Sequence, residues 1–403
     1  MTLNHVADER YMTAAEAANA LNVSLQTLYV YVGRKGIRSQ PIPGTKSKRY
    51  WRADIERLRR GRGAALGSAE MKEESELTFI TETDLFYRGR SATQLAETAT
   101  FEEVAALLWN ADPERAFPTE RPIAHPLLGP LDALLRGQPD VDRAASLFPV
   151  LEEADPRAYD LSAAGMARTG GDVLRWLAAL SVRASEPSSE PIHLFVARHL
   201  GCTAEEADLI RRMLVLWADH GFEPGAYAVR AVASAGVTPW RAVITGISVA
   251  NGRRNRLGRI EAIQRLLREI EEEPKPEAPI LQRLRDGEIV PGFDPPLYRE
   301  GEPIYRNGDP RARALLRCCD QIYGDDLQYL RLKVALALMS ELKALEPSNL
   351  LVSQFIFRRF GVNPRGTLFH LSRAAGWIGH AIEQHQAGEM EHGRGVYIGP
   401  LPA

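Results

Sequence analysis

The sequence is poor in cysteine and has no long apolar stretch. Its 403 residues include three cysteines, Cys202 and the adjacent Cys318 and Cys319, and this spacing forms neither a metal-binding motif nor a disulfide framework. No apolar run approaches the ~20 residues of a membrane span, and the first ten residues are too polar for a secretory leader. We therefore expect a cytoplasmic protein that has no membrane anchor and binds no metal.

Phosphate-binding motifs are missing as well. The chain has no G-x-x-x-x-G-K-[ST] loop and no G-x-G-x-x-G after a strand, so we expect no nucleotide cofactor. What is present is an ordinary globular composition, 45% hydrophobic and 25% charged, in a length that allows two or three domains.

Charge is distributed unevenly along the chain. Residues 1–70 carry 12 Lys/Arg and 6 Asp/Glu, although the net charge of the whole chain is -2. The remainder is therefore acidic. A basic segment joined to an acidic body predicts a nucleic-acid-binding head.

The first 62 residues have the pattern of a winged helix-turn-helix. Thr13 and Glu16 have capping-box spacing before a short Ala-rich helix, and Ser24 is a natural N-cap for a second helix to about Gly33. An extended segment at 41–51 predicts a hairpin wing, residues 53–60 predict a third short helix, and residues 63–70 predict a linker.

The basic residues of this head favour DNA binding, because each Lys or Arg that meets a phosphate releases counterions. The alternative is a helical protein-interaction module whose charges are merely solvated. The segments YMTAAEAA (11–18), VSLQTLYVY (23–31) and KRYWRADI (48–55) resemble MerR- and excisionase-type heads. The residues that we expect to contact DNA are Gln26, Thr27, Tyr29, Tyr31, Arg34, Lys46, Lys48 and Arg49.

Helical patterns dominate from residue 71 onward. A capping box at Thr100 and Glu103 precedes one helix, and further helices are predicted at 204–217, 259–271, 311–319, 327–345 and 366–384. Short strands are predicted at 77–80, 304–305 and 396–398. We expect a mostly α protein with a large domain at 71–252 and 351–403 and a small domain at about 253–350.

This body resembles the citrate synthases. The segments that carry the resemblance occur in the family's order: ESELTFI (74–80), YRGR (87–90), ATFEEVAALLW (99–109), ADH (218–220), PGF (291–293), DPRA (309–312) and RAAGWIGHAIEQ (373–384). The resemblance implies an all-α, two-domain subunit that forms a homodimer, with its active site between the domains. It also implies the condensation of acetyl-CoA with oxaloacetate.

The groups that perform this chemistry in the family are replaced. The family motif L-H-G-G falls on GRRNRLG (252–258), which puts Asn255 or Arg256 at the first histidine; the G-H-[RP]-x-Y motif puts Pro295 at the second. The P-N-V-D-F motif puts Leu350 at the carboxylate. No histidine occurs at 221–369 and no Asp or Glu at 347–382. The chain therefore lacks the family's acid and base.

The anion-binding positions of the family are partly kept. The resemblance places His220, Arg311 and Arg373 at these positions, with His392 and Arg394 near the third arginine. His220 has the alternative of a buried structural histidine, and Arg311 that of an ion pair at a helix start. Glu223 adds a negative charge close to this site.

Three functions compete. The first is a non-catalytic DNA-binding regulator that senses a carboxylate or acyl-CoA metabolite. The second is a citrate or 2-methylcitrate synthase, working alone or in a hetero-oligomer with an intact homologue. The third is a structural subunit that stabilises such a partner.

Overall fold

The computed structural model describes residues 11–293 except 22, 36, 43, 44, 46, 53 and 56–73, together with 297–299, 302–362 and 367–388. The chain divides into two compact units, and each is described by itself. We call the described residues up to Glu74 the head and those from Ser75 onward the body.

The head combines two short helices with a three-stranded antiparallel sheet of order β1-β3-β2. Thr13 and Glu16 form the predicted capping box, so that expectation is confirmed. A small core includes the buried side chains of Leu28, Ile37 and Tyr50. The predicted third helix falls largely outside the described residues. The elements are β1 (Tyr11–Thr13), α1 (Ala14–Ala20), α2 (Leu25–Lys35), β2 (Ser39–Pro41) and β3 (Lys48–Trp51).

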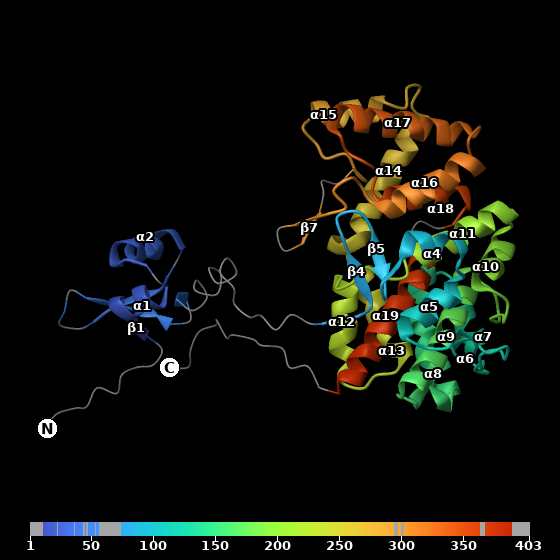
Figure 1. The fold of residues 1–403 in the computed structure, drawn as a ribbon, viewed down its shortest axis with the longest axis horizontal. Helices are drawn as coiled ribbons and strands as arrows, with labels where there is room; N and C mark the ends of the chain where they lie inside the picture. Colours follow the sequence, from blue (N-terminus) through green and yellow to red (C-terminus); the bar gives the residue numbers. More distant parts are fainter. Residues whose placement is uncertain are drawn as a thin grey trace. The chain divides into compact units, whose positions relative to one another are not determined.

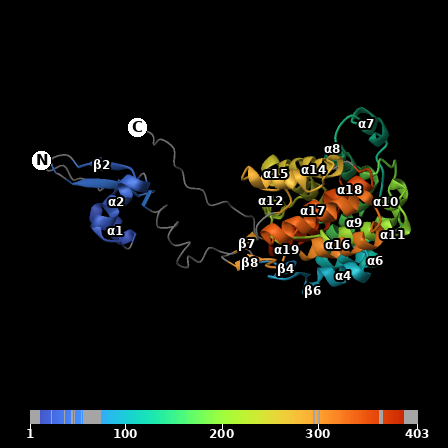
Figure 2. The same cartoon turned by 90° about the horizontal axis from the view of Figure 1, so that it is seen from above.

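The body is mostly helical, as predicted, and packs around the C-terminal helix α19 (Leu368–Ala387). Figures 1 and 2 show this helix in red, running between its neighbours. It contacts α5, α9, α11, α12 and α13. Small residues on α19 permit this close packing: Gly376 donates its N–H to the carbonyl oxygen of Ala218 at 2.9 Å. The helix therefore carries its residues deep into the core.

Helix starts in the body follow local capping signals. Thr100 and Glu103 form the predicted capping box of α5, and Thr203 and Glu206 form another at α11. The first half of the body consists of α4 (Ala92–Thr98), α5 (Phe101–Trp109), α6 (Pro113–Ala116), α7 (Leu128–Leu134), α8 (Asp140–Ala154), the 3-10 turn η1 (Pro156–Tyr159), α9 (Ala163–Ser181), α10 (Ile192–Leu200), α11 (Ala204–Leu216), α12 (Pro224–Ala233) and α13 (Pro239–Ala250).

A group of helices lies at one end of the body, at the top of Figure 1. It begins with a π-helical turn, a feature often found at functional sites. These elements are η2 (Arg253–Leu257), α14 (Gly258–Glu272), α15 (Ala278–Arg285), α16 (Pro310–Ile322), α17 (Leu327–Lys343) and α18 (Asn349–Arg359). The proposed division into a large and a small domain stays a prediction.

Strands are few and short. One small sheet joins β4 (Thr78–Ile80), β5 (Leu85–Tyr87) and β6 (Arg90–Ser91), and a hairpin joins β7 (Leu297–Arg299) to β8 (Glu302–Ile304). The strand predicted at 396–398 lies outside the described residues. Within the described ranges, no helix is both long and apolar enough to cross a membrane.

Candidate functional site

A cavity of about 640 Å³ opens among η2, α16, α19 and the segment before α18. The structure places seven of the residues named from the sequence on its lining: His220, Glu223, Asn255, Arg256, Arg311, Leu350 and Arg373. Pro295, His392 and Arg394 lie outside the described residues. The cavity collects side chains from positions more than 150 residues apart, and what it binds stays a prediction.

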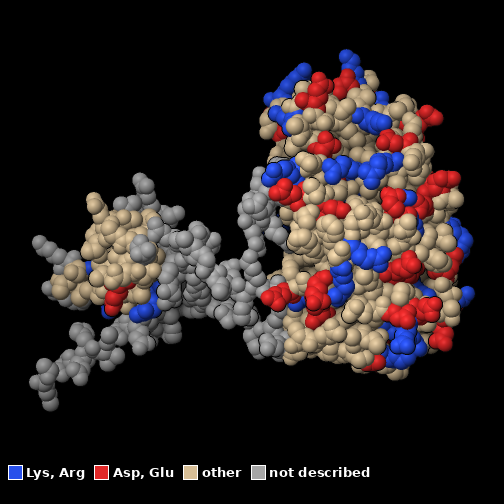
Figure 3. Space-filling model, in the orientation of Figure 1, with Lys and Arg blue, Asp and Glu red and all other residues tan. Residues whose placement is uncertain are grey.

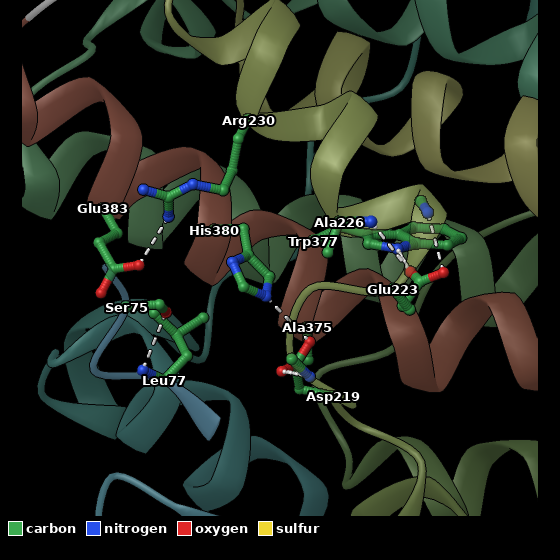
Figure 4. Close-up of polar contacts among 12 residues, drawn as sticks. Ser75, Leu77, Asp219, Glu223, Ala226, Arg230, Ala375, Trp377, His380 and Glu383 are labelled. Atoms are coloured by element: carbon green, nitrogen blue, oxygen red, sulfur yellow. Dashed lines mark hydrogen bonds and ion pairs between the residues drawn. The ribbon is translucent and has the colours of Figure 1, made fainter. Parts of the chain in front are cut away.

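His220 is held at the cavity by the loop that follows α11. Its Nε2 lies 3.1 Å from the hydroxyl of Tyr305. The preceding residue, Asp219, is fully buried; it accepts the N–H of Gly221 at 2.8 Å and lies 3.3 Å from Nε2 of His380. Burial opposes the charge of Asp219, but His380 and Arg373 outweigh it and lower the pKa of this carboxyl well below its usual range. Figure 4 shows the Asp219–His380 contact. The contact between Asp219 and His380 therefore holds this loop against α19.

Arg311 is paired with its own helix cap. Asp309 caps α16 and accepts from Nε of Arg311 at 3.0 Å and from Nη2 at 2.7 Å. Burial opposes the guanidinium charge, but the carboxylate of Asp309 prevails and raises the pKa of Arg311 above its usual value. The ion-pair alternative is thus observed at Arg311, which still lines the cavity.

Two other arginines lie on the ring of Phe369. The guanidinium carbon of Arg256 is 3.3 Å from the ring centroid and that of Arg373 is 5.3 Å from it. Arg373 is 5% exposed, and its Nε and Nη1 have no hydrogen-bond partner. Burial, with the neighbouring charges of Arg373 and then Arg259, lowers the pKa of Arg256 well below its usual value. An anion between these groups would relieve both penalties.

Asn255 and Leu350 supply no acid or base. The amide of Asn255 donates to the carbonyl oxygen of Val249 at 3.2 Å. Leu350 is half-buried against the core. Neither side chain titrates near neutral pH.

Glu223 faces the cavity but does not act as the free negative charge that the sequence suggested. Its carboxylate caps α12, accepting from the N–H of Gly225 at 2.8 Å and that of Ala226 at 3.0 Å. It also accepts from Nε1 of Trp377 at 3.0 Å (Figure 4). The helix N-terminus offsets its charge.

Sequence reasoning missed several residues of the site, Phe369 under the two arginines among them. Tyr305 contacts His220 from a left-handed turn with φ 55°. Trp217 donates from Nε1 to Oδ1 of Asn349 at 2.7 Å, which ties the segment before α18 to the end of α11. No local sequence pattern predicts these contacts, because they join residues that are 85 and 132 positions apart in the sequence.

The residues expected to contact DNA are spread over the head. Gln26 and Tyr29 are exposed on α2, and Lys48 is exposed on β3. Thr27 hydrogen-bonds Ser24, and Tyr31 packs against the head core. Lys46 and the side chain of Arg34 lie outside what the structure describes.

Arg49 has partners within the head. It donates from Nη2 to Oε1 of Gln40 at 3.2 Å, and its guanidinium carbon lies 4.4 Å from the ring centroid of Tyr11. On β3, Lys48 is therefore more accessible than Arg49. On the face of the body seen in Figure 3, positive and negative side chains are interspersed.

Comparisons with known proteins concern the body. A family model described as "Citrate synthase, C-terminal domain" matches residues 69–394. A 2-methylcitrate synthase from Shewanella oneidensis is 25% identical over 365 residues, covering 80% of this chain and 91% of that protein. A citrate synthase from Haloferax volcanii is 26% identical over 200 residues, 48% of this chain and 50% of that protein. The chain thus spans about half the length of several curated relatives that it matches.

The fold is shared with solved structures. A ternary complex of citrate synthase from Thermoplasma acidophilum with carboxymethyl coenzyme A and oxaloacetate superposes with a TM-score of 0.68 at 19% identity. The superposition covers 85% of this chain and 97% of that one.

Proposed function

This chain belongs to the citrate synthase family, and we propose that it is a non-catalytic DNA-binding regulator whose body binds a carboxylate or acyl-CoA metabolite. One observation carries the proposal. The cavity is lined by His220, Arg311 and Arg373 and also by Asn255, Arg256 and Leu350. The resemblance assigns the first three to the family's anion-binding positions, and it puts Asn255 or Arg256, and Leu350, at two of its catalytic positions. Its arginines are suited to hold an anion, and none of Asn255, Arg256 and Leu350 offers the acid or base of the family mechanism.

The condensation needs a base for a weakly acidic thioester methyl group and a donor to the forming enol oxygen. The acidic side chains among the described lining residues are Glu223, Asp309 and Glu346. Asp309 is paired with Arg311, and Glu223 caps α12. Glu346 is exposed and accepts from the hydroxyl of Ser340 at 3.3 Å. None is a buried carboxylate available as a base.

Ligand binding is supported by the remaining charge of the cavity. The related Thermoplasma acidophilum enzyme is known in complex with oxaloacetate, a dicarboxylate. In this chain the unpartnered N–H groups of Arg373 are suited to a carboxylate, since a guanidinium forms paired hydrogen bonds with such groups.

DNA binding is supported by the head. Two short helices and a three-stranded sheet with an exposed Lys48 fit the proposed winged helix-turn-helix of the MerR/excisionase type. A homodimer would present two heads to a pseudo-palindromic site.

The test of the body is CoA release from acetyl-CoA and oxaloacetate, and from propionyl-CoA and oxaloacetate. The purified chain is assayed alone and mixed with an intact homologue from the same genome. We expect no turnover by the chain alone. Turnover would refute the non-catalytic proposal and support a synthase acting by other groups. A mixture more active than the homologue by itself would identify a hetero-oligomer subunit instead.

The test of the head is fluorescence anisotropy with DNA from upstream of the gene at several salt concentrations. Lys48→Ala should weaken binding and reduce the salt slope by about 1. Lys343→Ala, at the end of α17 in the body, is the matched control and should change neither. Equal behaviour of the two variants would exclude the wing from DNA contact. Arg49→Ala should also weaken binding, but partly by loosening its contacts with Gln40 and Tyr11.

A further inference from the structure

One wall of the cavity is cationic, and we define it by Arg256 and Arg373. Asp309 pairs with Arg311, whereas Arg256 and Arg373 both lie on the ring of Phe369. Arg373 is almost fully buried and has two donors free. Two like charges held this close favour a ligand with two negative groups.

Apolar residues also line the cavity, and we call them its apolar wall: Ile304, Ala344, Leu345, Pro347 and Leu350. Along the chain they are interspersed with the polar lining residues Glu346, Ser348 and Asn349. Leu345 and Leu350 are only half-buried where they line the cavity. This leaves hydrocarbon surface in contact with solvent, and burial of that surface under a ligand is favourable.

The apolar wall is fixed relative to the cationic one. Asn349 accepts from Trp217, and the N–H of Ser348 donates to the carbonyl oxygen of Gly292 at 2.7 Å. The ring of Trp217 lies 6.1 Å from that of Phe369, which underlies both arginines. The two walls are therefore preorganised. Little binding free energy is spent on ordering their side chains when a ligand contacts both.

We propose that the ligand is an amphipathic dianion: two carboxylates at one end, held by Arg256 and Arg373, and a hydrocarbon group at the other, lying on Leu350 and its neighbours. This inference rests on the proposed function, which makes the cavity a ligand site. A four-carbon diacid alone would leave the apolar wall exposed to solvent. A cavity of about 640 Å³ lies in the range of sites for larger organic molecules.

The test is calorimetric titration of the full chain with succinate, methylsuccinate, ethylsuccinate and butylsuccinate. Affinity should rise about threefold to fourfold for each added methylene that reaches the apolar wall. A series with constant affinity, or no binding of any member at millimolar concentration, would overturn the proposal.

Variants separate the two walls. Leu350→Asp should remove the dependence on chain length, and Leu350→Ala, which is easier to accommodate, should reduce it. Leu342→Asp on α17, at a 49% exposed side chain outside the lining, is the matched control and should preserve it. Arg256→Gln should weaken every diacid about tenfold and leave the chain-length dependence intact. If affinity depends on chain length in the same way for Leu350→Ala, Leu350→Asp and the control, the proposed contact between the hydrocarbon group and Leu350 is refuted.

The experiments distinguish an error in the proposed regulatory function from an error in the proposed ligand class. Butylsuccinate could bind more tightly than succinate, as expected, and leave the DNA affinity unchanged. This result would support the proposed ligand class and refute the proposed regulator. Succinate and butylsuccinate could instead bind with equal affinity and both change the DNA affinity. This result would support the proposed regulator and refute the amphipathic ligand.

Discussion

Gly376 is where the C-terminal helix meets the loop that carries His220. A methyl group at this position would lie 2.3 Å from Oδ1 of Asp219 and 2.5 Å from the carbonyl oxygen of Ala218. Both neighbours are fully buried. Gly376→Ala must therefore push the loop away from α19 and lengthen the hydrogen bond from Gly376 to Ala218.

The expected cost follows from these two effects. Overpacking a tight interior costs about 1–3 kcal/mol, and loss of one backbone hydrogen bond about 1 kcal/mol. We expect Gly376→Ala to lower the free energy of unfolding by about 2–4 kcal/mol. With a slope of roughly 3 kcal/mol per molar urea, the midpoint falls by about 1 M.

Urea unfolding followed by tryptophan fluorescence measures this change in the body. Five of the six tryptophans are buried there: Trp109, Trp176, Trp217, Trp240 and Trp377. Gly129→Ala on α7 is the matched control, because a methyl group there meets nothing within 4 Å and alanine favours a helix. If Gly376→Ala is as stable as the control, the loop does not depend on this contact.

Three further outcomes are expected. Glu223→Ala removes the cap of α12 and the acceptor of Trp377, and should lower stability by about 2 kcal/mol in urea unfolding. Burial raises the pKa of Asp172 to about 6 despite the nearby Arg168. Its ionisation is thus disfavoured in the folded state, so stability rises as the pH falls from about 6 to 4; Asp172→Asn should abolish this trend in pH-dependent unfolding and stabilise the body at pH 7. Thr13→Ala breaks the capping box of α1 and should cost the head about 1 kcal/mol, measured by thermal unfolding detected through Trp51.

Helices with a local start signal could be predicted to within a few residues. The capping boxes at Thr13 and Thr100 mark α1 and α5, and the helix expected at 204–217 is observed as Ala204–Leu216. These signals act over one turn and need no tertiary contact. Helix α19 has no side-chain cap at its start; it is expected at 366–384 and observed as Leu368–Ala387, so its end differs more than its start.

The gathering of His220, Arg311 and Arg373 could be anticipated only through the family resemblance, which supplies the fold that brings them together. Their partners could be predicted only in part. An ion pair of Arg311 at a helix start is one of the alternatives that the sequence offers, and Asp309 provides it. The capping role of Glu223 is not among the alternatives. Arg256 lies on the ring of Phe369. Such pairings depend on packing between distant segments, which a pattern within one segment does not encode.

The C-terminal helix links the cavity to the first residues of the body. Arg373 is at the cavity, and Glu383, ten residues or about 15 Å further along α19, accepts the N–H of Glu76 at 2.8 Å and pairs with Arg230 (Figure 4). Glu76 is the second residue of the body. One continuous helix therefore carries both a residue of the cavity lining and the carboxylate that holds the start of the body. We expect a ligand that displaces α19 at Arg373 to change how firmly residues 75–77 are held.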